Sequence, residues 1–315
     1  CYYSIVLELF VDLYGWKVSY CKPTAVTKLS LDYEVENQEM EKKRKLFCEI
    51  SPFTYKISLL KCRLVRHIHN LVGFKKFAAT KSSEILPVLV YSHKSLIRRK
   101  LGNVDTNLQE NKAVNLSIAA PKVSNVLIRP GECFSFWKLV GSCTVKKGYK
   151  EGLTISNGGL GKDIGGGMCQ FTNLIHWMIL HTSMQIVEHH HHDMMDLFPD
   201  YGRQIPFGVG TSIMYNYLDY RFKNTTDNIF QLIIYTTPEY LCGELRTDKE
   251  LQYKYHIKVE DEFFSKEQDV VFRNNCIYRE CFDKETGILL TKELMKKNHA
   301  KVMYDTSDLT IIKRN

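Results

Sequence analysis

The feature that most constrains the fold is the stretch GGGMCQFTNLIHW, residues 165–177, in which three glycines lead directly into a run with helical periodicity. Apolar residues then recur three and four positions apart, which predicts a helix that ends at about residue 180. These residues are Met168, Phe171, Leu174, Ile175, Met178 and Ile179. Glycines adopt backbone conformations that other residues avoid, so the glycine loop before the helix can take unusual φ angles.

Other segments predict a mixed architecture. Residues 56–75 place apolar and basic residues as a short amphipathic helix does, and residues 111–126 predict a helix that Pro121 must kink or end. Residues 84–95 predict a strand broken early by Pro87. The predicted class is α+β, a β-rich domain with a central helix that follows the GGGxCQ loop.

Strand patterns dominate the second half of the chain. Residues 126–136 predict a hairpin with its turn at Pro130-Gly131. Aromatic and β-branched residues predict two further strands, one in residues 211–220 and one in residues 228–237. The sequence DKETG, residues 283–287, predicts a turn between two more strands.

Composition narrows the class of protein. With 44% apolar and 25% charged residues among 315, the chain is a folded globular protein and not a disordered one. Its net charge of +8 suits an anionic partner, but neither aromatic interleaving nor zinc-finger spacing accompanies the basic runs, so we expect no nucleic-acid partner. Glu8 and Asp12 interrupt the apolar start, so we expect no membrane span there. The ten scattered cysteines contain no CxxC pair and favour a reducing, cytoplasmic location.

We expect four regions along the chain. Residues 1–39 end in an acidic stretch and precede MEKKRKLF, so we interpret them as an over-extended or non-native leader before an initiator at Met40. Residues 40–102 form a basic N-terminal region, whose basic runs indicate either a solvated face or docking to a phosphate-rich surface. The third region, residues 103–246, is the main domain and takes its bounds from the family motifs described below, and residues 247–315 form a β-rich extension.

Cys169 falls in the first turn of the predicted helix. Unpaired backbone N–H groups stabilise negative charge there, which lowers the pKa of a thiol toward the reactive range. The glycines Gly165, Gly166 and Gly167 let a ligand backbone come close, and Gln170 with the first-turn amides is a candidate donor to an oxyanion. The pattern indicates either a cysteine nucleophile or a small residue that fills the core.

A nucleophile needs a base, and VEHHHHDMMDLFPD (187–200) offers four histidines in a row, His189 to His192. Alternate members share a face in an extended chain, so at most two can point toward Cys169. Asp193 or Asp196 is then a candidate to orient the imidazole.

A metal site is the competing interpretation of the same residues. It would draw on Cys169, His176, His181 and the histidine run, but His176 and His181 are five residues apart on a helix and diverge, and no HExxH occurs. The segment NGGLGKD (157–163) lacks the leading glycine and the Lys-Ser/Thr pair of a phosphate loop. We therefore expect neither a metal nor a cofactor.

Several motifs in order resemble the VanW family, which takes its name from an accessory gene of vancomycin-resistance clusters. They are IRPGECFSFWKLVG (128–141), GYKEGLTISNG (148–158), GGGMCQFTNLIHWMILHTSMQIVE (165–188) with a following histidine, and YLDYRFKNTT (217–226). The resemblance is close over residues 103–246. A family segment Glu-Arg-x-x-His falls on Glu188 to His192, with His189 at the arginine position, and so selects His192 as the partner of Cys169.

The resemblance also implies ligand-contacting roles for Glu188 and, in a DLRFxN-like segment, for Asp219 and Arg221. Many relatives carry an aspartate in a GxDA pattern before that segment, where this chain has GVGTS (208–212). Longer relatives join the domain to peptidoglycan-binding-like and G5 modules, which associates the family with the bacterial cell wall.

Two functions follow as hypotheses. The first is a cysteine-dependent acyl transferase or hydrolase acting on peptidoglycan peptides or precursors, with Cys169 as nucleophile, His192 as base, Gln170 at the oxyanion and Asp193 as orienter. The second is a non-catalytic domain that binds cell-wall fragments or a glycopeptide.

Overall fold

The computed structural model describes residues 46–72, 76–99, 105–156, 159–191, 195–200 and 202–313. The chain divides into two units, Cys1–Lys45 and Leu46–Asn315, and all described residues belong to the second. The interpretation of residues 1–39 as a leader, and the predicted site residues His192 and Asp193, lie outside the described residues.

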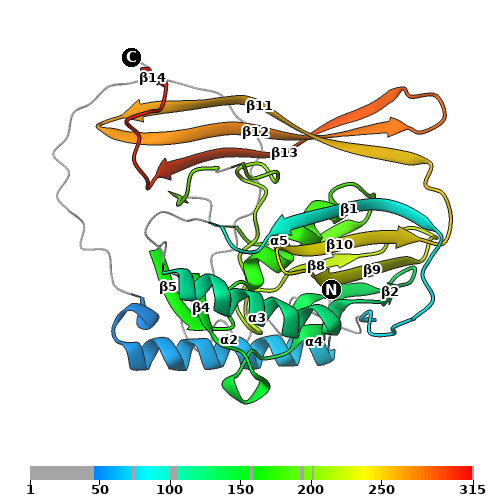
Figure 1. Cartoon of the computed structure of the whole chain (residues 1–315), viewed down its shortest axis with the longest axis horizontal. Helices are drawn as coiled ribbons and strands as arrows, with labels where there is room; N and C mark the ends of the chain where they lie inside the picture. The colour runs from blue at the N-terminus through cyan, green and yellow to red at the C-terminus, as the bar shows by residue number, and fades with distance from the viewer. Residues whose placement is uncertain are drawn as a thin grey trace, which may run out of the picture. The chain divides into compact units, whose positions relative to one another are not determined.

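The predicted central helix is α5 (Met168–Ile179), and most of its side chains are buried. It packs on a four-stranded antiparallel sheet, in which Gly243 leaves room for Leu174 and Met178 of the helix. The sheet has the order β1 (Val88–Leu96), β10 (Tyr240–Thr247), β9 (Phe230–Thr236) and β2 (Val126–Ile128). Helix α3 (Thr106–Val123) packs against β9, and its apolar face joins the same core as α5 (Figure 1).

Smaller elements surround this core. They are η1 (Phe47–Glu49), α2 (Pro52–Val72), α4 (Phe136–Val140), η2 (Val145–Lys147), a three-stranded sheet of β3 (Cys133–Ser135), β8 (Arg221–Lys223) and β6 (Gln185–Glu188), and a hairpin of β4 (Glu151–Ser156) and β5 (Gly159–Ile164). The hairpin leads directly into the turn before α5, so it positions the glycines of that turn.

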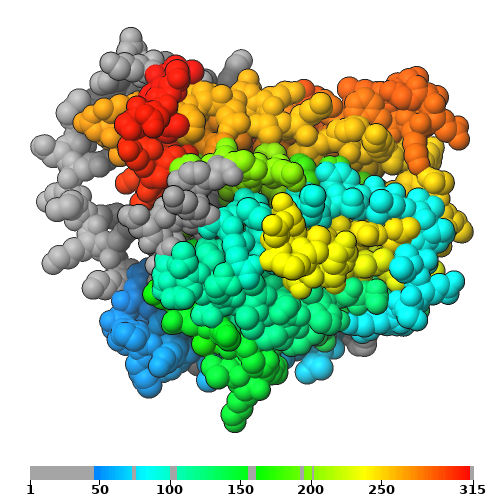
Figure 2. All heavy atoms as spheres, viewed as in Figure 1, coloured from blue at the N-terminus to red at the C-terminus, as the bar shows by residue number. Residues whose placement is uncertain are grey.

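The residues after 247 form a second layer of long strands. The sheet has the order β14 (Ile311–Lys313), β11 (Tyr253–Glu267), β12 (Val270–Asp283), β13 (Leu289–Val302) and β7 (Met195–Asp196). Ile277 of β12 packs with Trp177 and Leu180 at the end of α5, which fixes this sheet against the core. Figure 2 shows β11 to β13, in yellow-orange and orange, along the top of one face above β1, in cyan.

Most predicted elements are confirmed. The helix predicted at 56–75 is α2, Pro121 lies in the last turn of α3, and β1 begins directly after Pro87. The strand predicted at 228–237 is β9, and the DKETG segment turns between β12 and β13. The sheet that β1 shares with β10 joins residues from the predicted basic region to residues of the main domain.

Two predictions are wrong. The turn at Pro130-Gly131 exists, with Gly131 at φ 78°, but the flanking strands do not pair with each other. β2 pairs with β9 and β3 pairs with β8, because Asn224 bonds the backbone on both sides of the turn and directs the chain from one sheet to another. Residues 211–220 form no strand; a tight bridge between Met214 and Leu218 replaces it, and the strand begins at Arg221.

None of the described helices combines the length with the apolar character that crossing a membrane requires.

Candidate functional site

Three other parts of the chain pack closely against the turn before α5, and each of its three glycines contacts one of them. A Cβ on Gly165 would lie 2.4 Å from Cβ of Cys143, and a Cβ on Gly166 would lie 2.2 Å from the backbone of Gly152 in β4. A Cβ on Gly167 would lie 2.4 Å from Cγ of Lys112, and Gly167 also has a φ of 104°, which disfavours other residues. The three glycines are therefore required by packing.

Asn115 of α3 fixes the same turn through hydrogen bonds. Its side chain is fully buried, and its Nδ2 donates to the carbonyl oxygens of Gly166 and Lys150, each at 2.9 Å. Its Oδ1 accepts the backbone N–H of Lys150 at 2.8 Å. These bonds satisfy backbone groups that would otherwise be buried without partners, so Asn115 holds the glycine turn against α3.

The glycine turn borders a cavity of about 800 Å³, and Cys169 lines it. The walls come from the turn, from the start of α5, from α3, from the β4–β5 hairpin and from residues 195–215. The lining includes polar, cysteine and glycine residues from each of these walls: Arg99, Gln109, Lys112, Cys143, Gly165, Gly166, Gly167, Cys169, Gln170, Asn173, His191, Asp196, Arg203 and Thr211. This is the size of a small-ligand site.

Burial raises the pKa of the Cys169 thiol above its ordinary value, while backbone N–H groups of Ile213 and of Cys169 itself oppose that rise. We expected the first turn of the helix to lower this pKa, and that expectation is wrong because desolvation of the thiolate outweighs the backbone dipoles. Among the described residues, no side chain forms a hydrogen bond with Sγ of Cys169. The thiol is therefore protonated near neutral pH until a base takes its proton.

Gln170 ties α5 to the sheet. Its Nε2 donates to Oγ of Ser95 and to the carbonyl oxygen of Leu96, each at 2.9 Å. The amide that we considered for an oxyanion is thus directed at β1, and Gln170 holds the start of α5 in place.

The described histidines of the run alternate in direction, as expected for an extended chain. The ring of His189 stacks on that of His176 at 4.3 Å, and its Nε2 lies 2.8 Å from the carbonyl oxygen of Gly210. His190 points the other way, toward Glu188 at 3.1 Å. His191 points into the cavity that Cys169 lines.

The surroundings of His191 fix which nitrogen carries its proton. Nδ1 lies 3.1 Å from Nζ of Lys296, and an ammonium group can only donate, so Nδ1 accepts and the proton of a neutral ring sits on Nε2. Nε2 and Oδ1 of Asn173 both lie within 4 Å of the point where a Cβ on Gly210 would stand. The ring of His191 therefore lies beside the helix face that carries Cys169 and Asn173.

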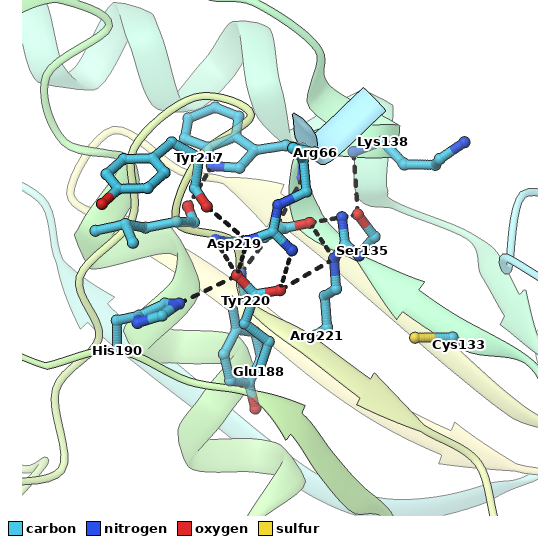
Figure 3. A network of polar contacts seen from close by, with 12 residues as sticks. Arg66, Cys133, Ser135, Lys138, Glu188, His190, Tyr217, Asp219, Tyr220 and Arg221 are labelled. Carbon is cyan, nitrogen blue, oxygen red and sulfur yellow. Dashed lines mark hydrogen bonds and ion pairs between the residues drawn. The ribbon is translucent and has the colours of Figure 1, made fainter. Parts of the chain in front are cut away.

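Glu188, Asp219 and Arg221, for which the resemblance implied ligand contacts, form a buried polar network apart from the cavity lining (Figure 3). Arg66 of α2 donates two hydrogen bonds of 2.6 Å to Glu188, and the N–H of Asp219 donates a third at 2.9 Å. Burial alone would raise the pKa of Glu188, but the bonds from His190, Arg66 and Asp219 hold it at about 2.

Asp219 connects this network to α4. It accepts a hydrogen bond from Oγ of Ser135 at 2.5 Å, one from Nε of Arg221 at 2.7 Å and one from the N–H of Trp137 at 3.1 Å. The network joins α2, β6, β8 and the start of α4, and so it holds together the elements that surround the histidine run.

The metal interpretation finds no support in the geometry. His176 is buried and bonds Tyr220, and burial lowers its pKa well below the ordinary value, whereas His181 bonds the carbonyl oxygen of Trp177 and stacks on Tyr91. Within the part of the chain that the structure describes, no three His, Cys, Asp or Glu side chains gather as metal ligands. Asp196, the alternative orienter, pairs with Arg273 at 3.2 Å and Tyr304 at 2.9 Å.

The cationic wall of the cavity was not predicted from the sequence. Lys112 is only 8% exposed, and burial, followed by the charges of Arg99 and Arg98, lowers its pKa to about 7. Burial and the charge of Arg203 lower the pKa of Arg99. The signal in the sequence was a lysine at position 112 on the apolar stripe of α3, between Leu108 and Leu116 at spacings of four residues.

A family model and one curated relative identify the same family. A family model described as VanW like protein matches residues 111–246. The chain is 32% identical over 228 residues to the vancomycin B-type resistance protein VanW of Enterococcus faecalis (strain ATCC 700802 / V583), covering 72% of this chain and 82% of that protein. It is 30% identical over 118 residues to the uncharacterized protein YoaR of Bacillus subtilis (strain 168), covering 36% of each. No solved structure matches the chain.

Proposed function

The chain belongs to the VanW family, and we propose that it is a cysteine-dependent acyl transferase or hydrolase acting on peptidoglycan peptides or their precursors. The observation that carries the proposal is the position of Cys169, which lies at the start of α5 on the wall of a ligand-sized cavity, with a backbone N–H of Ile213 directed at its sulfur. His192, the base that the family motif selects, follows directly on His191, which lines the same cavity.

The reaction has two steps. As Sγ attacks the carbonyl carbon of a peptide bond, the base takes the thiol proton, and that proton then passes to the leaving amine as the C–N bond breaks. A second amine, or water, attacks the thioester and releases Cys169 as a thiol.

The raised pKa of Cys169 sets a requirement on this mechanism. Because the thiol is protonated at neutral pH, proton removal must accompany attack, and a base is required in the first step. We assign that role to His192, with Asp193 to orient its ring. A cytoplasmic location would direct the chemistry to soluble precursors.

A non-catalytic binding domain is the second candidate, and the same thiol favours it. Cys169 forms no hydrogen bond with a described side chain, and its burial stabilises the neutral form, as expected of a cysteine that only lines a ligand site. In that case the cavity binds a cell-wall fragment without reacting with it.

Mass spectrometry of the protein, intact and after digestion, separates the two candidates once the protein has been incubated with synthetic stem peptides. We expect an acyl adduct on the peptide that contains Cys169, together with released amine, and the loss of both in Cys169→Ser. Cys143→Ser is the matched control, because Cys143 lines the same cavity and its pKa is also raised by burial. A Cys169→Ser protein that binds stem peptides as wild type does, with no adduct on the wild type, would establish the binding domain instead.

A further inference from the structure

One wall of the cavity carries positive charge that nearby acidic groups do not neutralise. Neither Lys112 nor Arg99 pairs with a carboxylate among the described residues. Of the two acidic residues in the described lining, Asp196 pairs with Arg273, and Asp163 accepts the N–H of Ile164 at 2.7 Å and forms no ion pair. A third cation of the wall, Arg203, pairs with Asp200 at 2.6 Å. Among the described residues, Lys112 and Arg99 are therefore the cations of the wall that no carboxylate pairs with.

These cations repel one another. Arg99 lowers the pKa of Lys112, and Arg203 lowers that of Arg99, so Arg99 lies within electrostatic reach of both other groups. Holding like charges together in a partly desolvated cavity costs free energy. A bound anion would remove that cost.

The same wall holds polar atoms without partners. Gln109 is 6% exposed, and its Oε1 forms no hydrogen bond; it precedes Lys112 by three residues on α3, and so lies on the same face of the helix. Nε of Arg203 is also buried without a partner. Buried polar groups are rarely left unsatisfied, so this pairing of an acceptor with several donors points to a ligand that carries both an N–H and an anion.

We propose that this wall is a subsite for the C-terminal residue of a peptide, in which Arg99 and Lys112 bind its carboxylate, Nε of Arg203 supplies a further donor, and Oε1 of Gln109 accepts its backbone N–H. A guanidinium pairs with a carboxylate through two parallel hydrogen bonds, which gives the subsite a preferred ligand geometry. The proposal rests on the proposed function only in taking the ligand to be a peptide.

Calorimetric titration of the Cys169→Ala protein tests the subsite without chemistry. The probes are N-acetyl-D-Ala-D-Ala, with its free carboxylate, and the same peptide as a C-terminal amide. We expect the acid to bind about tenfold or more tightly than the amide, and Arg99→Gln to remove most of that preference. Gln109→Leu, which removes an unpaired polar atom and so preserves folding, should weaken both probes by about fivefold.

Arg279→Gln is the matched control, because Arg279 pairs with Glu293 outside the cavity, and it should change binding by less than about twofold. Equal binding of acid and amide, no binding of either at about 10 mM, or an unaltered preference in Arg99→Gln overturns the subsite. If the preference persists but no acyl adduct ever forms, the subsite stands and the enzymatic proposal fails.

A second inference comes from a separate surface, on α2. Six apolar residues recur on one side of this helix, and each is 42–80% exposed: Phe53, Ile57, Leu60, Leu64, Ile68 and Leu71. The opposite side docks on the core through Arg63, which bonds the carbonyl oxygen of Tyr215, and through Arg66. The apolar stripe therefore faces away from the core, and the start of α2 lies at the surface in Figure 2, in blue.

The charge of α2 indicates what covers this stripe. No acidic residue occurs in the whole helix, and helical spacing places Lys56 along one edge of the stripe. An apolar face of this length, about 31 Å, on a helix that carries basic and no acidic residues matches a helix that lies in the surface of an anionic bilayer. We infer that α2 binds the chain to the surface of a membrane that contains anionic lipid.

Sedimentation of the full chain with lipid vesicles tests this inference. We expect binding to vesicles of phosphatidylglycerol and phosphatidylcholine, at least about tenfold weaker binding to phosphatidylcholine alone, and a loss of about tenfold or more in Leu60→Gln/Leu64→Gln. The control is Leu290→Gln/Leu294→Gln, which alters two exposed leucines of β13 with the same spacing. No binding to anionic vesicles overturns the inference, as does a Leu60→Gln/Leu64→Gln variant that binds vesicles as wild type does. The inference is also overturned if the wild type is a dimer in solution and this variant is a monomer, because a second copy of the chain then covers the stripe.

Discussion

Replacement of Glu188 by Gln tests whether this motif residue is structural. Its carboxylate accepts hydrogen bonds from Arg66, from His190 and from the backbone of Asp219, which outweigh its burial and hold its pKa at about 2 instead of 4.5. A difference of that size corresponds to about 3 kcal/mol of folding free energy at neutral pH. Because only 14% of the Glu188 side chain is exposed, solvent screens these interactions only weakly.

The sign of the pH dependence follows from the lowered pKa. The stabilisation is fully present above pH 4.5, where the carboxylate of the unfolded chain is also ionised, and it is lost as the pH falls toward 2. Urea unfolding at a series of pH values should therefore show Glu188→Gln less stable than wild type by about 3 kcal/mol at pH 7, with the difference shrinking below pH 4.5.

The matched control is Glu293→Gln, which breaks a surface pair with Arg279 and should cost less than about 1 kcal/mol. A cost below about 1 kcal/mol for Glu188→Gln, or a cost that does not vary with pH, would refute this account of the network. A normal fold that fails to bind stem peptides would instead support the ligand role that the resemblance implied.

Three further outcomes are expected. Gly166→Ala forces a Cβ into the backbone of β4 and should destabilise the protein by about 3 kcal/mol or more. The control is Gly202→Ala, where the space around the Cβ is open and the cost should be about 1 kcal/mol. Thermal unfolding compares the stabilities of the two variants. Asn115→Ala should lower the free energy of unfolding by about 2–4 kcal/mol in urea, because the carbonyl oxygens of Gly166 and Lys150 lose their donors; a cost under about 0.5 kcal/mol contradicts this. Lys112→Met should be more stable than wild type at pH 6, and this advantage should shrink as the pH rises from about 7 to 10.5. Over that range the lysine has lost its proton in the folded protein but keeps it in the unfolded chain, so the wild type gains stability with pH. An advantage that is constant with pH would show that Lys112 is not desolvated.

The local elements could be predicted wherever one periodicity was strong. α5 was predicted from its apolar spacing, and β9 and the turn between β12 and β13 from their composition. The pairing of β2 and β3 with different sheets could not be predicted, because Asn224, almost a hundred residues later, redirects the chain between them.

The candidate site could likewise be predicted from the sequence only in part. The position of Cys169 at the start of a helix followed from the glycines, but its raised pKa did not, since that depends on how much protein surrounds the sulfur. The cationic wall could not be predicted either, because Arg203 lies far from Arg99 and Lys112 in the sequence and only the fold brings the three to one cavity. By contrast, the alternation of His189, His190 and His191 was predictable from the geometry of an extended chain.

The pH profile of Cys169 alkylation tests the central claim most directly. Mass spectrometry follows the peptide that contains Cys169 after timed exposure to iodoacetamide, with Cys143 of the same cavity as an internal standard. If a histidine base assists Cys169, its rate should show an inflection at about pH 6.5, exceed that of Cys143 at neutral pH, and lose both features in His192→Ala. A rate that rises only above about pH 9, and equally in wild type and His192→Ala, would contradict the claim that Cys169 is a nucleophile.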